Sequence, residues 1–288
     1  MRWKGRRASA NVEDRRSMRG PGLAGGGIGT LVIIGLMLYM SGGDPTVLLE
    51  SGLLEEQLGG GQILDGPVSP QDDERAEFVK VVLADTEDVW HALFQQAGDD
   101  YIEPRLVLFR GRVQSGCGGA SAAVGPFYCP ADQQVYLDLQ FFDELHQRFG
   151  AAGDFAQAYV IAHEIGHHVQ KLIGTSDEVH TEQQRLDEVE GNRLSVRLEL
   201  QADYLAGVWA HHIQKTKQVL EPGDIEEALD AANAIGDDRL QQQSQGTVVP
   251  DSFTHGTSAQ RIRWFREGFE SGDFRAADRL FTEGYKQL

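Results

Sequence analysis

The feature that most constrains this chain is a long uncharged stretch near its N-terminus. No charged side chain occurs from Gly20 to Gly43, and the most apolar part of that stretch reads "IGTLVIIGLMLYM". The first twenty residues carry seven basic and two acidic side chains. A basic flank followed by an apolar segment is typical of a membrane anchor whose N-terminus lies in the cytoplasm. We therefore expect a basic cytoplasmic segment at 1–20 and one transmembrane helix at 21–41.

A cleaved signal peptide is the main alternative to an anchor. It would share the basic start and the apolar middle, but "LYMSGGDP" contains no Ala-x-Ala-like cleavage site. A buried core helix is a second alternative, since the strictly apolar core is shorter than about 20 residues and is interrupted by glycine. The basic flank and the missing polar face favour the anchor.

The rest of the chain is strongly acidic. Beyond residue 20 it carries 19 basic and 42 acidic side chains, and the 288 residues together have a formal net charge of −18. Such a surface repels phosphate, so nucleic acid is not an expected partner. With the predicted anchor, this acidic part lies outside the cytoplasm, where disulfides persist. Cys117 and Cys129 could close a small loop there, although their spacing alone leaves two free buried thiols open.

The pattern after the apolar stretch predicts a tether and then one large domain. Glycine, proline and acidic residues interrupt 42–71, which is typical of a linker. From residue 72 apolar residues return at helical spacing, so we expect a domain at 72–288 that begins with a helix. "RLVLFRGRV" and "QQVYLDL" are rich in branched and aromatic residues and predict strands.

Helical periodicity dominates the remainder of the domain. Helices are expected at about 141–149, 154–173, 182–216, 224–243, 258–270 and 273–282. Asp154 is placed to cap the second of these. The predicted fold class is therefore α+β, with a small early β-sheet followed by a predominantly helical core.

The octapeptide "HEIGHHVQ" lies within the predicted helix 154–173. Residues four apart on a helix lie one above the other, so His163 and His167 can present two imidazoles to one ion. Glu164 is offset by one residue and can reach a water on that ion without ligating it. This is the H-E-x-x-H arrangement of two zinc ligands and a general base. An ordinary helix is the alternative, and His168, off the metal face, is expected to be structural.

A catalytic zinc site needs a third protein ligand and an open position. The extended H-E-x-x-H pattern fails here, because Gln170 and Ile173 stand where its glycine and histidine should be. The helix "RLSVRLELQADYLAGVWAHH" places Glu199 and Asp203 four apart within an apolar run. Glu199 can complete the site while Asp203 fixes the tautomer of a ligating histidine. An exposed acidic pair is the alternative, and the competing ligands would be Glu178, Glu182, Glu188 and Glu190.

Three segments, "HEIGHH", "ELQADYLAG" and "SFTHGTSAQRIRWFREGF", together resemble the bacterial family of membrane-anchored neutral zinc metallopeptidases, which is related in pattern to the gluzincins. The resemblance extends over nearly the whole chain. It implies a zincin-like fold in which Zn²⁺ is bound by the two histidines of H-E-x-x-H and the glutamate of E-x-x-x-D. These map onto His163, His167 and Glu199, with the base at Glu164.

Two further segments offer supporting roles. His255, with Arg261 following it, could stabilise a tetrahedral oxyanion, because gluzincin-like sites often take such a donor from a late segment. A histidine on a surface loop is an equal alternative. The small residues of "GGASAAVG" suit an edge strand that pairs with an extended peptide, or a disulfide-closed turn.

The predicted function is hydrolysis of peptide bonds by a zinc-activated water with Glu164 as general base, in a single-pass protein of the cell membrane. The expected partners are a peptide or protein substrate and the bilayer. A catalytically inert, membrane-tethered zinc-binding or scaffold protein is the alternative. Three predicted ligands with a base beside the opening favour catalysis, since structural zinc usually has four ligands rich in cysteine. The sequence does not indicate an oligomeric state.

Overall fold

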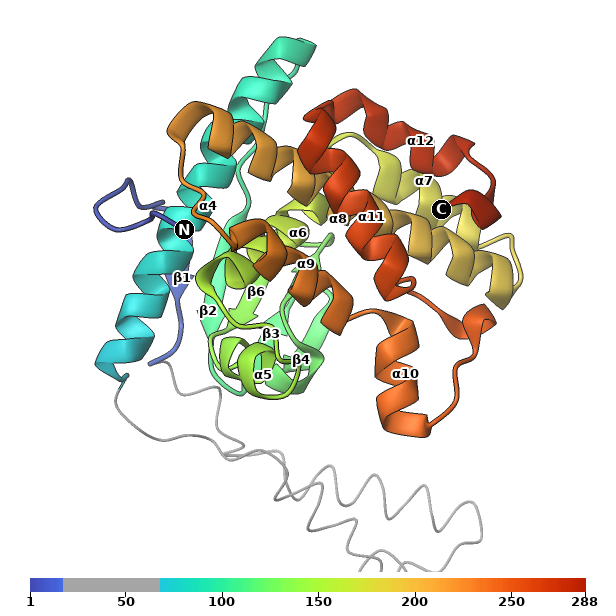
Figure 1. Ribbon diagram of the computed structural model, residues 1–288, viewed down its shortest axis with the longest axis horizontal. Helices are drawn as coiled ribbons and strands as arrows, with labels where there is room; N and C mark the ends of the chain where they lie inside the picture. The colour runs from blue at the N-terminus through green and yellow to red at the C-terminus, as the bar shows by residue number, and fades with distance from the viewer. Residues whose placement is uncertain (18–67) are drawn as a thin grey trace, which may run out of the picture.

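A computed structural model of the chain describes residues 1–17 and 68–288 (Figure 1). The predicted anchor at 21–41 and nearly all of the predicted tether lie outside these residues. Within the described ranges, every helix is too short or too polar to cross a bilayer.

The main sheet has four strands in the order β1-β2-β6-β5. Strand β1 (Val12–Asp14) pairs in parallel with β2 (Arg105–Phe109), and β2 pairs in parallel with β6 (Gln134–Asp138). The remaining edge is β5 (Phe127–Cys129), antiparallel to β6. Nearly all of β2 and β6 is buried, which explains why both strands have continuous apolar runs.

The predicted strand "RLVLFRGRV" is divided by a turn. Gly111 has a φ of 71°, and a bend at residues 110 and 111 separates β2 from β3 (Arg112–Ser115). Strand β3 pairs antiparallel with β4 (Gly118–Ser121) in a separate two-stranded sheet. The segment "GGAS" is therefore a strand, as one of the two interpretations expected.

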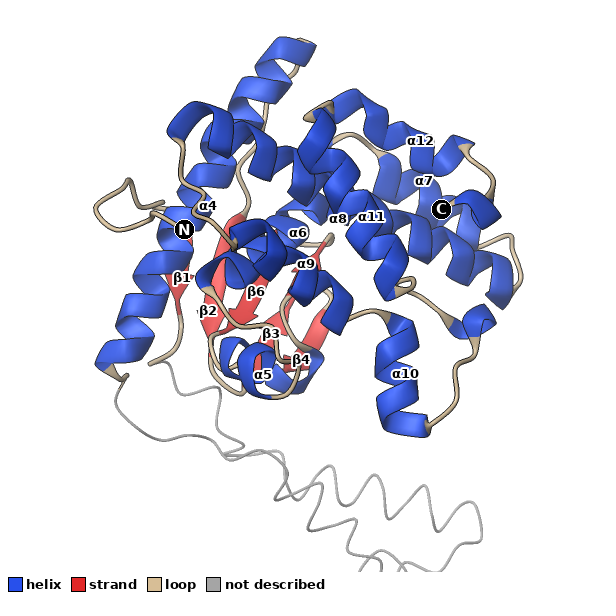
Figure 2. Cartoon of the chain, viewed as in Figure 1, coloured by secondary structure: helices blue, strands red, loops and turns tan. Residues whose placement is uncertain are grey.

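Helices make up most of the remaining described structure (Figure 2), which confirms the α+β class. They are α4 (Pro70–Ala97), α5 (Phe141–Gln147), α6 (Asp154–Leu172), α7 (Thr175–Gln183), α8 (Glu188–Lys217), α9 (Asp224–Ala234), α10 (Asp237–Gln245), α11 (Ser258–Ser271) and α12 (Arg279–Thr282). Two predicted helices are each divided. The predicted helix 182–216 is interrupted after the end of α7 and starts again where Asp187 caps α8. The predicted helix 224–243 is interrupted between α9 and α10.

Helix α6 lies at the centre of the domain. It contacts α4, α8 and α9 and also strands β5 and β6 (Figure 1). Its predicted cap is wrong: Asp154 is already the first helical residue, and Gly153 before it has no capping side chain. The carboxylate of Glu227 on α9 accepts the Phe155 N–H instead, at 3.0 Å. The start of α6 is therefore satisfied by a neighbouring helix rather than by its own sequence.

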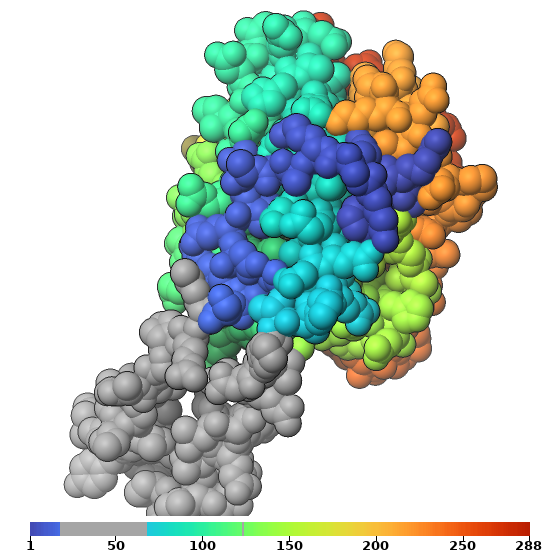
Figure 3. Space-filling view, turned by 90° about the vertical axis from the view of Figure 1, so that its left-hand side faces the viewer, coloured from blue at the N-terminus to red at the C-terminus, as the bar shows by residue number. Residues whose placement is uncertain are grey.

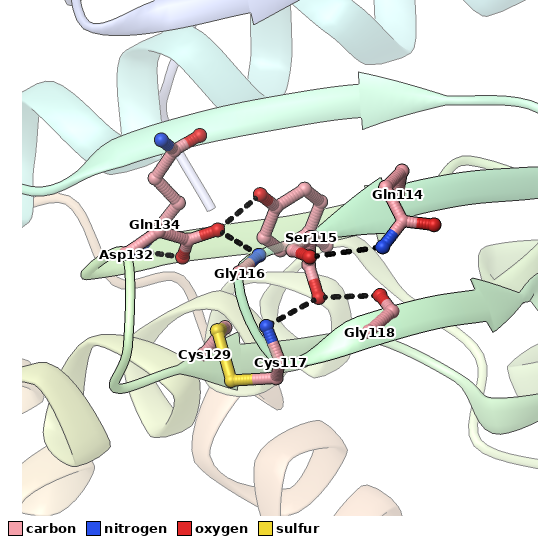
Figure 4. The surroundings of a disulfide bond; sticks show 9 residues. Gln114, Ser115, Gly116, Cys117, Gly118, Cys129, Asp132 and Gln134 are labelled. Carbon is pink, nitrogen blue, oxygen red and sulfur yellow. Dashed lines mark hydrogen bonds between the residues drawn. A yellow bond between two sulfur atoms is a disulfide. The ribbon is translucent and has the colours of Figure 1, made fainter.

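The two cysteines form a disulfide, with the sulfurs 2.08 Å apart (Figure 4). The bridge joins the turn after β3 to the end of β5. Asp132 organises the same region, because its carboxylate accepts the Gly116 N–H at 2.6 Å and the Tyr136 hydroxyl at 2.7 Å. The bridge predicted from the sequence is thus present.

Candidate metal centre

Helices α6 and α8 touch at a pair of very small residues. A Cβ placed on Gly166 would lie 2.9 Å from the carbonyl oxygen of Ala202 and 3.1 Å from its Cα. Any side chain at Gly166 would therefore push the helices apart. The candidate ligands His163 and His167 flank Gly166, while Glu199 and Asp203 flank Ala202. This close crossing brings both pairs of polar side chains to one place.

Three potential ligands converge at the crossing. The Nε2 atom of His163 lies 3.2 Å from one carboxylate oxygen of Glu199, and the Nε2 atom of His167 lies 3.4 Å from the other. One ligand atom from each residue falls within 4.8 Å of the others. Two imidazole nitrogens and one carboxylate form a donor set that suits Zn²⁺.

Asp203 orients the first imidazole. Its Oδ1 lies 2.8 Å from Nδ1 of His163. An Nδ1–H donated to Asp203 leaves the Nε2 lone pair facing Glu199. The structure therefore brings Asp203 to the position predicted for it, beside a candidate ligand.

A buried network holds Asp203 in turn. The guanidinium of Arg261, on α11, donates to both of its carboxylate oxygens, at 2.8 and 3.0 Å, and the Tyr159 hydroxyl donates to Oδ1 at 2.5 Å. Burial raises the pKa of Asp203, but Arg261 outweighs it and the pKa falls to about 2. Asp203 is therefore a fixed anion that can accept from His163 at any ordinary pH.

Arg261 reaches this network through another close helix crossing. A Cβ on Gly268 of α11 would lie 2.0 Å from the carbonyl oxygen of Tyr204 on α8, so only glycine fits there. From the sequence, Arg261 was expected only as a neighbour of His255, and no role was predicted for Tyr159. Arg261 and Asp203 are opposite in charge and both buried, which would have indicated that they form a pair. The sequence does not show which charged residues are buried, so this pair could not be predicted from it.

Gln170 orients the second imidazole. Its Oε1 lies 2.9 Å from Nδ1 of His167, while its Nε2 donates to the carbonyl oxygen of Leu198 at 2.6 Å. The amide is fully buried, and the bond to Leu198 fixes which end faces the histidine. Sequence reasoning treated Gln170 only as a departure from a longer motif, and so missed this contact.

The site strongly favours positive charge. Burial lowers the pKa of His167, but the charge of Glu199 outweighs it and raises the pKa to about 9. Burial raises the pKa of Glu199, and the neighbouring His167 reverses this and holds it well below its usual range. Protons on the imidazoles are the competitors that a metal ion must displace.

Glu164 lies beside the converging ligands without joining them. Its side chain is nearly buried, and its charge contributes to the raised pKa of His167. Its carboxylate is not one of the three donors that meet at the crossing. It is therefore available for proton transfer next to a bound ion.

His255 lies in the loop before α11 and interacts with Asp237, 3.2 Å from its Nδ1. Asp237 also accepts the backbone N–H groups of residues 254, 255 and 256, at 2.7, 2.6 and 3.1 Å. The bond to Asp237 raises the pKa of His255, burial lowers it, and the charge of Glu199 raises it further. His255 is half-exposed on a surface loop, bonded to Asp237 and within electrostatic range of Glu199.

The other residues weighed from the sequence lie elsewhere. His168 is fully buried and is held between the Tyr128 hydroxyl at 3.1 Å and the Ile102 carbonyl oxygen at 2.7 Å. The competing acids are all exposed on α7 or at the start of α8, namely Glu178, Glu182, Glu188 and Glu190. Of the described residues, the only other group that could hold a metal is Asp154, Asp224 and Glu227.

Comparison with known proteins identifies the family of this chain. A family model described as "Putative neutral zinc metallopeptidase" matches residues 1–280. The chain is 55% identical over 282 residues to "Uncharacterized protein YpfJ" of Escherichia coli K12, covering 95% of this chain and 96% of that one. It is 44% identical over 217 residues to "Uncharacterized protein Rv2575" of Mycobacterium tuberculosis, covering 70% and 72% respectively.

No solved structure matches the chain. The family match extends over nearly the whole sequence and includes every residue of the candidate centre. The chain therefore belongs to the family described as "Putative neutral zinc metallopeptidase".

Proposed function

We propose that this protein is a zinc-dependent endopeptidase whose metal ion is held by His163, His167 and Glu199. One observation carries the proposal: both imidazoles turn Nε2 toward Glu199, and each Nδ1 is engaged by a partner that suits that tautomer. Such orientation of metal-binding histidines by outer partners is a recurrent property of zinc sites. Three protein ligands leave a position for water, as catalytic zinc sites do.

The side chains around the three ligands can divide the work of hydrolysis. When bound, zinc supplies the Lewis acidity that makes water nucleophilic near neutral pH and polarises a peptide carbonyl. Glu164 accepts the proton of the attacking water and delivers it to the leaving amine. His255, positioned by Asp237, donates to the developing oxyanion.

The hairpin beside the disulfide offers a place for an extended substrate. Strand β4 pairs with β3 on one side, and in the part of the chain that the structure describes no other strand joins that two-stranded sheet. A peptide can pair with such an edge through main-chain hydrogen bonds. Its small residues would let the substrate backbone approach closely.

Zinc content and peptide cleavage of the purified full chain test the proposal. We expect one zinc per chain in the wild type and in Glu164→Gln, with cleavage of a mixed peptide library by the wild type alone. Glu188→Gln, which alters an exposed acid on α8, is the matched control and should cleave normally. Zinc in all three proteins with no cleavage by any would contradict the proposal and favour an inert zinc-binding protein.

A further inference from the structure

The first 17 residues, here called the N-terminal strap, are built into the same body as the candidate site. Strand β1 pairs with β2, with Val12 opposite Leu106. The register is held by hydrogen bonds from the Leu106 N–H to the Asn11 carbonyl oxygen at 2.9 Å and from the Arg15 N–H to the Leu108 carbonyl oxygen at 2.8 Å. Figure 3 shows the strap lying across α4. The strap thus completes one edge of the main sheet and covers a helix.

The basic residues of the strap serve as counter-charges within the domain. Arg6 pairs with Asp85 of α4, and Arg7 pairs with Glu87 at 2.9 Å. Asp85 and Glu87 are only 1% and 2% exposed, so both carboxylates need partners. Further ion pairs within 4 Å join strap cations to acids of the strap or of α4, through Lys4, Arg15 and Arg16.

Glu87 shows how far the domain depends on the strap. Besides Arg7, its carboxylate accepts hydrogen bonds from the Ser9 hydroxyl and from the Asn11 amide, the latter at 2.9 Å. All three donors belong to the strap. Without it, a carboxylate buried on α4 would lose each of them.

Arg16 joins the strap to the start of α4. Its guanidinium donates to the Asp72 carbonyl oxygen at 2.8 Å and to the Asp73 carboxylate at 3.1 Å. Residues 16 and 72 are therefore neighbours in space, although about fifty residues separate them in sequence. The hydrocarbon core of a bilayer is about 30 Å thick, so a single crossing between them would separate these contacting groups by more than the contacts allow.

We propose that the strap and the catalytic domain lie on the same side of any membrane that this chain meets. The predicted arrangement, with the N-terminus in the cytoplasm and the domain outside, rested on the basic flank. Most of those basic side chains are instead paired with carboxylates of the folded domain, so they are not free to mark the cytoplasmic side. The disulfide between Cys117 and Cys129 favours the extracytoplasmic side for both parts. This inference does not depend on the proposed peptidase activity.

Labelling of single added cysteines in the full chain tests the topology. Ser17→Cys reports the strap and Gln243→Cys, on exposed α10, reports the domain; the wild type, whose cysteines are bridged, gives the background. Spheroplasts of a bacterial host are treated with a membrane-impermeant maleimide before and after permeabilisation. We expect the two positions to behave alike. Labelling of one position in intact spheroplasts and of the other only after permeabilisation would overturn the proposal.

Cross-linking in isolated membranes tests the contact itself. In Arg16→Cys/Asp73→Cys, a short bis-maleimide should join the two positions, as detected in tryptic peptides by mass spectrometry. Arg16→Cys/Gln96→Cys is the matched control, since residue 96 lies about 35 Å farther along α4 at 1.5 Å per residue. The contrary result is that both positions of the first pair react with single maleimides as readily as those of the control and yet are never cross-linked. That result would show that the strap is not docked in the membrane-bound protein.

Discussion

Gly166 of α6 lies against the backbone of Ala202 of α8, close enough that a Cβ on Gly166 would be 2.9 Å from the Ala202 carbonyl oxygen. This contact sets the separation of the two helices that carry the candidate ligands. The geometry of the metal centre therefore depends on a residue that touches no metal.

Substitution of Gly166 by Ala should weaken zinc binding by about tenfold or more and destabilise the protein by about 1–3 kcal/mol, because the added methyl group overpacks the crossing. Zinc affinity measured against a competing chelator, together with urea unfolding, checks this. Gly191→Ala on α8 is the control: no atom lies within 4 Å of its added Cβ, so its zinc affinity should be unchanged. Equal affinity in both variants would show that the crossing tolerates expansion.

Gln170→Leu should lower zinc affinity by about 10–100-fold while the fold is retained, because His167 loses the partner that orients it. Gln201→Leu provides a comparison, since Gln201 is equally buried on α8 but bonds to Ala277, away from the ligands. Competition with a chelator, measured on both proteins, gives the ratio of their zinc affinities. An affinity in Gln170→Leu no weaker than in Gln201→Leu would contradict the positioning role of Gln170.

Arg261→Met should destabilise the zinc-free protein by about 3–5 kcal/mol at pH 7, because the buried Asp203 would lose its guanidinium partner and keep only His163 and Tyr159. Because folding lowers the pKa of Asp203, its ionised carboxylate stabilises the folded protein at pH values above its unfolded pKa of about 3.9. This contribution is lost as the pH falls toward about 2. The difference from wild type should therefore shrink below about pH 4. Urea unfolding at several pH values measures it.

Arg263, a less buried arginine of the same helix, supplies the control for that measurement. Arg263→Met removes a partly exposed pair with Glu267 and should cost at most about 1 kcal/mol. Equal losses of unfolding free energy in Arg261→Met and Arg263→Met would mean that the buried network adds little to stability.

Zinc affinity should rise with pH by about tenfold per unit for each proton displaced, until the pH approaches about 9. The reason is the raised pKa of His167, which keeps its imidazole protonated below that value in the metal-free protein. Glu199→Gln removes the charge that raises the pKa of His167. This variant should bind zinc more weakly, and its zinc affinity should depend less on pH near neutrality. A pH-independent affinity in the wild type would refute this assignment of the competing proton.

His255→Ala should lower kcat by about 10²–10³-fold without loss of zinc, because a donor to the oxyanion is removed. His180→Ala, an exposed histidine on α7, is the control and should cleave at the wild-type rate. Peptide hydrolysis and metal content are measured on the same samples. Full turnover by His255→Ala would remove His255 from the mechanism.

Part of the candidate site follows from local sequence geometry. The four-residue spacing of His163 and His167 places both on one helix face, and Glu199 and Asp203 repeat that spacing farther along. The α+β class and the disulfide were also predictable, because strand, helix and cysteine signals lie within short windows. The order of the strands could not be predicted, because β1 precedes the apolar stretch in the sequence and pairs with β2, which follows it.

By itself the sequence determined which candidate ligands share a helix face, because a helix repeats every 3.6 residues and so records in its spacing which side chains lie together. Only the tertiary structure decided what holds those residues in place. Arg261 reaches Tyr159 across 102 positions, and Glu227 caps α6 from another helix. Such contacts arise where separate elements pack together, and no local period encodes which elements will meet.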